Sequence, residues 1–297
     1  MEKIATLLPD SADPLGESHV KISFSTIVCH EYTLPQIAES AKRHGYDGIE
    51  LYGMEGQKVT PDFLEPRLSE IRRDLAGVDL PVIHSWTYLD YRHNEDQANR
   101  IKTISKALEL ASKLEVPKVK MFGATPPDDM ALNDAFDAMA DDLGPLVKRA
   151  GELGVVLMIE THDGLGRGID VHNAISRVDD PALGAVWDTF HPHRLGEDVS
   201  VTDELIGART VHVHIKDNAR FPGRYLDRFK SWIPTRPGEG EIPNREAVAL
   251  LAARGYDQYL SVDAERMWDP IEEYDEPEVI MANYAAAMRE YIRSAGA

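Results

Sequence analysis

Cysteine is almost absent from this chain of 297 residues, and Cys29 is its only example. Without a second cysteine no disulfide framework can form within the chain, which is typical of a protein from a reducing compartment. Apolar runs are also short, and none approaches the roughly 20 residues that a membrane-spanning helix needs. Residues 1–18 lack the charged and then apolar pattern of a secretion signal. We therefore expect a cytoplasmic protein in which Cys29 is a small buried residue rather than a nucleophile.

Basic residues are scarce relative to acidic ones. The chain has 32 lysines and arginines against 51 aspartates and glutamates, which gives a formal net charge of −19. Nucleic acids and anionic membranes attract positively charged surfaces, so we expect neither as a general partner. A local basic pocket is still compatible with this charge. Hydrophobic residues make up 43% of the chain, which is enough for a sizeable core.

Side chains with metal-binding chemistry close four apolar segments in the second half of the chain. The segments are residues 155–162, 184–188, 210–217 and 259–265. Glu160 and Asp188 follow the first two apolar runs, His214 lies in the third segment, and Asp263 and Glu265 close the fourth. A strand that is apolar on both faces is usually a buried parallel strand, and α/β proteins keep their sites at the carboxyl ends of such strands. The pattern therefore predicts one site built from several strand ends.

Strand-like and helix-like segments alternate along the whole chain. We expect strands at residues 21–26, 46–51, 80–86, 116–122, 155–162, 184–188, 210–217 and 259–265. Helical patterns follow at residues 34–44, 61–76, 94–114, 132–151, 171–178, 201–206, 244–255 and 278–293. Eight strand–helix units of roughly 30 residues predict the α/β fold class and a (β/α)₈ TIM barrel. No shift in composition divides the chain, so we expect a single domain over residues 1–297, with an N-terminal arm at about residues 1–20.

Glu160, Asp188 and His214 lie about one βα repeat apart. Adjacent strands therefore bring them to one end of the barrel, where their carboxylates would repel one another without a cation. Carboxylate oxygens and an imidazole nitrogen suit a divalent ion, for which we expect Mn²⁺, with Mg²⁺, Co²⁺ and Zn²⁺ as alternatives. Asp263 and Glu265 share strand parity, so either can be the fourth ligand while the other orients a ligand or transfers a proton.

Several other polar residues have two interpretations. Glu50 is either a substrate-facing acid or a structural one, and single barrel histidines such as His84 and His212 are more often hydrogen-bonded core residues than ligands. Residues 217–240 have no helical period and are rich in basic and aromatic side chains, including Arg220. This loop either binds an anionic or polyhydroxyl substrate or pairs its arginines with nearby acids.

Five motifs stand out together: Ile-Glu-Thr-His (159–162), Trp-Asp-Thr-Phe-His (187–191), Val-His-Ile-Lys-Asp (213–217), Gly-Glu-Gly-Glu-Ile-Pro (238–243) and Gly-Tyr-Asp (255–257). With them, nearly the whole chain resembles the xylose-isomerase-like TIM barrels, the sugar phosphate isomerase/epimerase family. That family includes sugar epimerases and isomerases, inosose dehydratases and an abasic-site endonuclease. The motifs are specific for the superfamily but not for one reaction.

The resemblance to ketose epimerases implies roles for particular residues. A glutamate of the fifth strand, here Glu160, and an acid of the last strand would bind the metal and exchange protons with the substrate, while Asp188 and His214 complete the coordination. The histidine three residues after the aspartate, here His191, and the arginine six residues after the ligand histidine, here Arg220, would contact substrate. The position of the family's last-strand glutamate falls on Asp263, a shorter side chain, and Glu265 competes with it for that role.

The endonuclease branch of the resemblance does not fit well. It needs extra histidines for three zinc ions, and His84 matches one of them. The fourth predicted strand instead carries Met121 and Phe122, and residues 217–240 contain no Asp-x-His motif. Together with the acidic charge, this argues against a role in DNA repair.

We predict a divalent-metal-dependent sugar isomerase or epimerase that acts on a small keto-sugar or polyol. The predicted catalytic residues are Glu160, Asp263 and Glu265, and the predicted metal ligands are Glu160, Asp188, His214 and Asp263 or Glu265. The predicted substrate contacts are His84, Trp86, His162, His191, Lys216, Arg220 and Trp268. Two other functions stay open: a metal-dependent lyase or dehydratase of a keto-sugar or keto-inositol, and a non-catalytic sugar-binding barrel. The expected partner is a small-molecule sugar, and a homo-oligomer is compatible with the sequence.

Overall fold

A computed structural model describes residues 20–221, 231–267 and 275–296. Trp268 and all but the last residue of the expected N-terminal arm lie outside the described residues. Within them, eight parallel strands close into a barrel in the order β1-β12-β9-β8-β7-β6-β5-β2. These strands are β1 (Lys21–Ser25), β2 (Gly48–Leu51), β5 (Asp79–Leu89), β6 (Lys118–Gly123), β7 (Val156–Glu160), β8 (Leu183–Asp188), β9 (Thr210–Ile215) and β12 (Tyr259–Val262). The predicted TIM barrel is confirmed.

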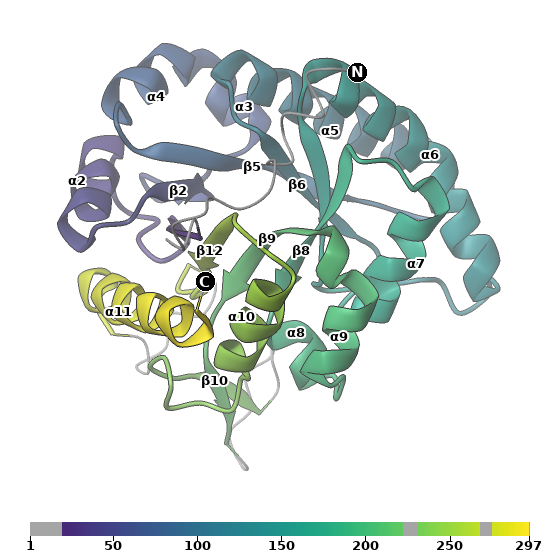
Figure 1. Cartoon of the computed structure of the whole chain (residues 1–297). Helices are drawn as coiled ribbons and strands as arrows, with labels where there is room; N and C mark the ends of the chain where they lie inside the picture. The colour runs from purple at the N-terminus through teal and green to yellow at the C-terminus, as the bar shows by residue number, and fades with distance from the viewer. Residues whose placement is uncertain (1–19, 222–230, 268–274, 297) are drawn as a thin grey trace.

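Helices surround this barrel (Figure 1). They are α2 (Leu34–His44), α3 (Pro61–Leu64), α4 (Leu68–Asp74), α5 (Glu95–Leu114), α6 (Leu132–Leu153), α7 (Gly168–Val178), α8 (Phe190–Arg194), α9 (Val199–Ile206), α10 (Asn244–Ala253) and α11 (Pro277–Ala295). Two 3₁₀ turns, η1 (Glu65–Arg67) and η2 (Gly207–Arg209), complete the ring. The last helix, α11, packs against both α10 and α2, so the two ends of the barrel sequence meet.

Helix ends follow local sequence chemistry. The Thr33 amide donates to the Gln36 side chain at 2.9 Å, which helps to cap the start of α2. The helix ends at Gly45, whose φ of 69° lies in the left-handed region where glycine carries no Cβ penalty. Among the described helices, none combines the length and apolar composition that crossing a bilayer requires.

Two expected segments are built differently from the sequence prediction. The helix expected at residues 61–76 is divided into α3, η1 and α4, because Pro66 has no amide to donate and clashes with the preceding turn. The strand expected at residues 80–86 continues to Leu89 as β5, although its register against β6 shifts between His84 and Tyr88. At that irregularity Trp86 has a φ of 59°, an uncommon conformation for an aromatic residue.

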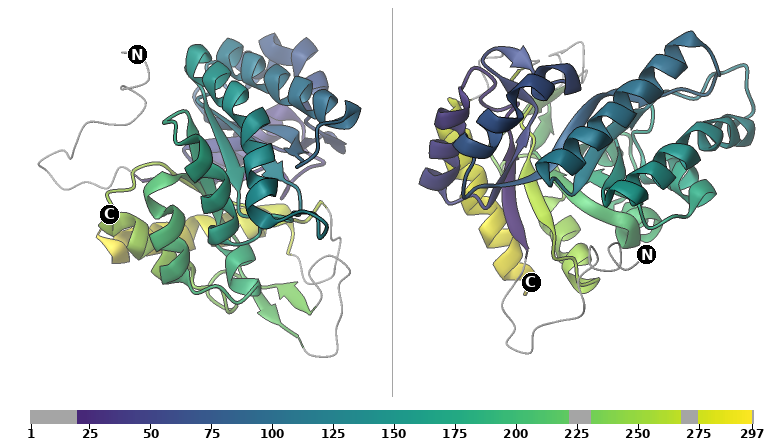
Figure 2. Two further views of the ribbon diagram at one scale, coloured as in Figure 1. Left: turned by 90° about the vertical axis from the view of Figure 1, so that its right-hand side faces the viewer. Right: turned by 90° about the horizontal axis from the view of Figure 1, so that it is seen from above.

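Two short antiparallel strand pairs extend from the barrel loops. One consists of β3 (Gly53–Met54) and β4 (Gln57–Lys58), and the other of β10 (Asn218–Arg220) and β11 (Trp232–Pro234). Figure 2 shows the second pair, in light green, extending away from the ring of helices. The basic loop expected at residues 217–240 is therefore partly a β-ribbon, and its residues 222–230 lie outside the described part of the chain.

Candidate functional site

Four buried side chains meet where β7, β8, β9 and β12 end. They are Glu160, Asp188, His214 and Asp263, and one ligand atom from each lies within 4.8 Å of the others. All four side chains are buried. The structure thus brings together the strand-end residues that the sequence singled out, and Asp263 rather than Glu265 is the last-strand acid of this ligand group.

The imidazole of His214 faces the three carboxylates with its Nδ1 atom. This atom lies 2.6 Å from Glu160 Oε1, 3.7 Å from Asp263 Oδ2 and 3.9 Å from Asp188 Oδ2. Burial alone would lower the pKa of His214, but the carboxylates of Glu50, Asp263 and Glu160 raise this pKa well above its ordinary value. These carboxylates therefore stabilise positive charge on the His214 ring.

Glu50 of β2 lies on the other side of the His214 ring. One of its oxygens is 3.2 Å from His214 Nε2 and 3.1 Å from His84 Nε2, and the other contacts His212 Nε2. Burial would raise the pKa of Glu50, but His212 and His214 lower it well below its ordinary value, so the carboxylate is ionised and only accepts hydrogen bonds. Each of the three imidazoles must then carry a proton on Nε2.

His84 and His212 are neutral members of this network. Burial lowers the pKa of each to about 4. His212 is thus a hydrogen-bonded core histidine, and His84, which was also considered a substrate contact, lies at the same carboxylate. Its predicted contact with substrate stays a prediction.

Two buried lysines compensate part of the negative charge. Lys120 Nζ of β6 lies 2.5 Å from Glu160 Oε2. Lys216 Nζ, just after β9, lies 2.9 Å from Asp188 Oδ2 and 3.4 Å from Asp263 Oδ2, and it also contacts Glu265. Burial would lower the pKa of Lys216, but these acids raise it well above its ordinary value, so both ends of the ligand group carry an ammonium partner.

Sequence reasoning missed Lys120, although a signal was present. Lys118 and Lys120 alternate with Val119 and Met121 in β6. Lysines at alternate positions of an otherwise apolar buried strand point to the same face, which here is the barrel interior. A lysine so placed needs a buried acid, and Glu160 on the neighbouring strand β7 is that acid.

A second group lies beside the first and contains His162, His191 and Glu265, all buried. The Nε2 atoms of His162 and His191 are each 3.9 Å from Glu265 Oε1, and the two rings are 4.1 Å apart. His191, a predicted substrate contact, is fully buried and lies in the short helix α8. A helix of five residues leaves too little periodicity to be recognised in sequence.

The position of His162 depends on a close contact between two loops. Strand β7 ends at Glu160 rather than at His162, and His162 pairs with Leu165 in an isolated β-bridge. Gly164, between His162 and Leu165, lies very close to the loop after β6. A Cβ on Gly164 would be 2.1 Å from the Thr125 amide nitrogen. Only glycine fits, and the resulting turn holds His162 with its ring 5.0 Å from that of Phe122.

Aromatic and cationic residues surround the strand ends. The Trp86 ring lies 4.2 Å from the Tyr52 ring and is tilted by 46° to it, and Lys58 Nζ lies 4.9 Å from the Trp86 ring. Arg220 of β10 is exposed, with its guanidinium 5.0 Å above Trp232. Arg220 is therefore placed beside an aromatic residue, and its predicted substrate contact stays a prediction.

The turn at residues 238–242 is held by one buried acid. Asp217 accepts hydrogen bonds from the amides of Gly238, Gly240 and Ile242. A Cβ at Gly240 would lie 2.1 Å from Asp217 Oδ1, so Gly240 allows a close approach between this turn and Asp217.

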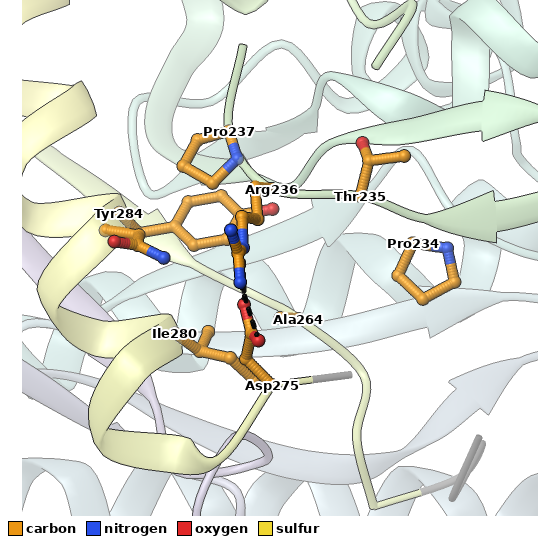
Figure 3. A pocket seen from close by; sticks show the side chains of 9 residues that line it. Pro234, Thr235, Arg236, Pro237, Ala264, Asp275, Ile280 and Tyr284 are labelled. Atoms are coloured by element: carbon orange, nitrogen blue, oxygen red, sulfur yellow. Dashed lines mark hydrogen bonds and ion pairs between the residues drawn. The ribbon is translucent and has the colours of Figure 1, made fainter. Parts of the chain in front are cut away.

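A separate small cavity lies beside Ala264, just after the end of β12. Figure 3 shows Arg236 paired with Asp275 at this cavity, with their nearest atoms 2.8 Å apart. Ala264 lines the cavity, whereas its neighbours Asp263 and Glu265 contact Lys216. The cavity is thus distinct from the space between the candidate ligands.

Comparison with known proteins adds relatives of low identity. The chain is 24% identical to fructoselysine 3-epimerase of Escherichia coli O157:H7 over 246 residues, which cover 77% of this chain and 84% of the relative. It is 28% identical to inosose dehydratase of Mesomycoplasma hyopneumoniae (strain 7448) over 176 residues, which cover 54% and 55%.

A solved structure has the same fold. It is the IOLI protein with a bound zinc atom, which superposes with a TM-score of 0.72 at 18% identity and covers 93% of this chain and 98% of that one. The sequence profile of the xylose isomerase-like TIM barrels matches residues 38–290, which is most of the chain. The motifs, the closed barrel and this match together place the protein in the xylose isomerase-like TIM barrel family.

Proposed function

We propose that this protein is a divalent-metal-dependent isomerase or epimerase of a small keto-sugar or polyol. The observation that carries the proposal is the buried group of Glu160, Asp188, His214 and Asp263, with ligand atoms within 4.8 Å of one another. Similarity to fructoselysine 3-epimerase supports the reaction class. We propose that these four residues hold the ion and that Glu265 stands outside the coordination.

The residues present fit a divalent cation. Three ligand carboxylates and Glu265 converge with only Lys120 and Lys216 as described ammonium partners, and Asp263 Oδ1 is buried without a hydrogen-bond partner among the described residues. The His214 ring donates its other N–H to Glu50, which is the arrangement that metal-binding histidines almost always have. Three carboxylates and one imidazole suit Mn²⁺, our proposed ion, and also Mg²⁺, Co²⁺ or Zn²⁺.

A bound ion would polarise the substrate's carbonyl and adjacent hydroxyl and so acidify the C–H bond next to the carbonyl. Glu160 then removes or returns a proton on one side, and Glu265 does so on the other. The two acids come from β7 and from the residues after β12, and β8 and β9 lie between these strands in the barrel. Lys216 contacts Glu265. His162 and His191, beside Glu265, bind substrate oxygens.

A lyase is the second candidate, favoured by the similarity to inosose dehydratase. The first step is the same removal of a proton next to a carbonyl, but a hydroxyl on the adjacent carbon then leaves with a proton. Lys216, whose Nζ contacts Glu265, is a donor that can supply that proton. A non-catalytic sugar-binding barrel is disfavoured, because such a role needs no converging carboxylates.

Deuterium exchange separates these functions. We would incubate the Mn²⁺-loaded protein with a panel of ketoses and keto-inositols in D₂O and follow the products by NMR and mass spectrometry. An isomerase or epimerase incorporates deuterium next to the carbonyl without loss of water, whereas a lyase forms a conjugated product that is lighter by one water. Glu160→Gln is the control. Absence of exchange and of elimination across the panel, with metal bound at the four ligands, would leave only the binding role.

A further inference from the structure

Lys120 has more hydrogen-bond donors than the described residues use. Its side chain is buried, and its Nζ lies 2.5 Å from Glu160 Oε2. An ammonium group has three N–H bonds and no acceptor. Across residues 20–221, 231–267 and 275–296, Glu160 is the only group that accepts a hydrogen bond from Lys120. Buried donors are almost always paired, so the remaining N–H bonds indicate an acceptor outside the described residues.

Two aromatic rings lie close to this ammonium. Its Nζ is 4.7 Å from the centre of the Phe122 ring and 5.6 Å from that of Tyr52. Ring faces attract a cation but are much weaker acceptors than oxygen. The Phe122 ring lies 5.0 Å from the His162 ring, and the Tyr52 ring lies 4.2 Å from the Trp86 ring. His162 and Trp86 are predicted substrate contacts, so Lys120 has the same surroundings as residues that are expected to bind substrate.

The two oxygens of Glu160 face different partners. Oε1 lies 2.6 Å from His214 Nδ1, whereas Oε2 lies 2.5 Å from Lys120 Nζ. The ion of the proposed function belongs to the His214 side, because His214 is one of its proposed ligands. Lys120 therefore reaches the substrate from the other side of the acid that removes the proton. The substrate oxygen within its reach lies beyond the reacting carbon, away from the carbonyl and hydroxyl at the ion.

A neutral hydroxyl suits this position better than a phosphate or a carboxylate. Lys120 already shares its charge with Glu160, and a second anion would be repelled by this carboxylate in a buried site. A hydroxyl accepts a hydrogen bond without adding charge. Building on the proposed function, we propose that Lys120 binds substrate, with one N–H on Glu160 and another on a hydroxyl of the carbon beyond the one that loses its proton. The protein then selects ketoses or keto-inositols that carry a hydroxyl at that carbon.

A deoxy analogue tests this contact in the unmodified protein. The probes are the ketose of the D₂O panel that takes up deuterium fastest and its analogue with hydrogen in place of the hydroxyl beyond the exchanging carbon. For D-fructose exchanging at C3, the analogue is 4-deoxy-D-fructose. A hydrogen bond from a charged donor predicts that kcat/KM for deuterium uptake is about 10–100-fold lower for the deoxy analogue. Equal values for the two ketoses would overturn the proposal.

Variants assign the preference to Lys120. In Lys120→Met, kcat/KM for the two ketoses should differ by less than about threefold, because the donor is gone. This ratio cancels any loss of metal or any movement of Glu160, since both ketoses meet the same altered site. Lys118→Met is the matched control on the same strand: the Lys118 Nζ donates to Gln258, which precedes β12, so the preference should remain. An unchanged preference in Lys120→Met would show that another group holds the hydroxyl.

A second readout does not need a folded methionine variant. The lysine ammonium signals of ¹⁵N-labelled, Mg²⁺-loaded protein can be followed by NMR, and Lys120→Arg identifies the Lys120 signal by its loss. We expect this signal to shift when the hydroxylated ketose is added at saturation, and to shift much less with the deoxy analogue. Equal responses to the two ketoses would contradict the proposal.

The two hypotheses fail in different ways. If no ketose or keto-inositol of the panel takes up deuterium or loses water, the proposed function fails, and the role of Lys120 fails with it. If deuterium uptake occurs without a preference for the hydroxylated ketose, or if the preference survives in Lys120→Met, only the role of Lys120 fails. Uptake with a preference that Lys120→Met removes and Lys118→Met keeps supports both.

Discussion

Strands β7, β8, β9 and β12 and the strands opposite them contribute different things to the barrel interior. The first set ends in the ligand group of Glu160, Asp188, His214 and Asp263. Strands β2 and β6 instead supply Glu50 and Lys120, which contact the ligands from behind. One half thus presents the groups that can bind a cation, and the other half fixes their proton positions and charge.

Removing the cation should have the largest effect, because it takes away the ion that the first set of strands is proposed to bind. We expect exhaustive chelation to abolish activity, because the substrate carbonyl would lose the ion that polarises it. An ion present at about 100 times its Kd contributes about 2.7 kcal/mol, which predicts a fall in Tm of roughly 5–10 °C. Added Mn²⁺ should restore both. Full activity after chelation, checked by elemental analysis, would refute metal dependence.

The next largest effects should distinguish the roles of Asp263 and Glu265, the two acids that follow β12. Glu265→Gln should keep the metal and lower kcat by about 10²–10⁴, because it removes a proton-transfer group. Asp263→Asn should instead weaken metal binding. Steady-state kinetics and metal titration of both variants test this assignment. Equal behaviour near that of the unmodified protein would show that neither acid has its proposed role.

The contribution of strands β2 and β6 can be tested at Glu50. Glu50→Gln should lower metal affinity by about 10–100-fold, because an amide no longer offers a charged acceptor to the His214 N–H. Titration calorimetry of the folded variant measures this effect. Glu39→Gln changes an exposed glutamate of α2 in the same way and should have no effect. Unchanged metal affinity in Glu50→Gln would mean that the hydrogen bond from His214 to Glu50 does not contribute to metal binding.

Arg220 should give the smallest effect. Its exposed guanidinium lies over Trp232, so a contact with substrate would be partly screened by solvent. We expect Arg220→Ala to raise KM by up to about tenfold with metal content unchanged, and lysine to rescue it only partly because it lacks the planar fork. Unchanged kinetics would place Arg220 outside the site.

The group of metal-type ligands was predictable, because strand parity and strand ends indicate which side chains point to the same place. Glu160, Asp188 and His214 each follow or occupy a buried apolar strand, and parallel strands end at the same rim. The supporting contacts were harder to predict. Glu50 and His214 are 164 residues apart, and nothing local indicates that their side chains meet. Trp86 has a backbone conformation that propensity alone would not assign to tryptophan.

The close approach at Gly164 has a consequence for engineering. TIM-barrel loops are often treated as separable modules that can be exchanged one at a time. Here the turn after β7 touches the backbone of Ala124 and Thr125 in the loop after β6, with no room for even a methyl group between them. The two loops therefore constrain each other's conformation, and His162 lies on one of them. A new specificity grafted onto either loop alone would clash or leave a gap, so directed changes at this side of the mouth should vary both loops together.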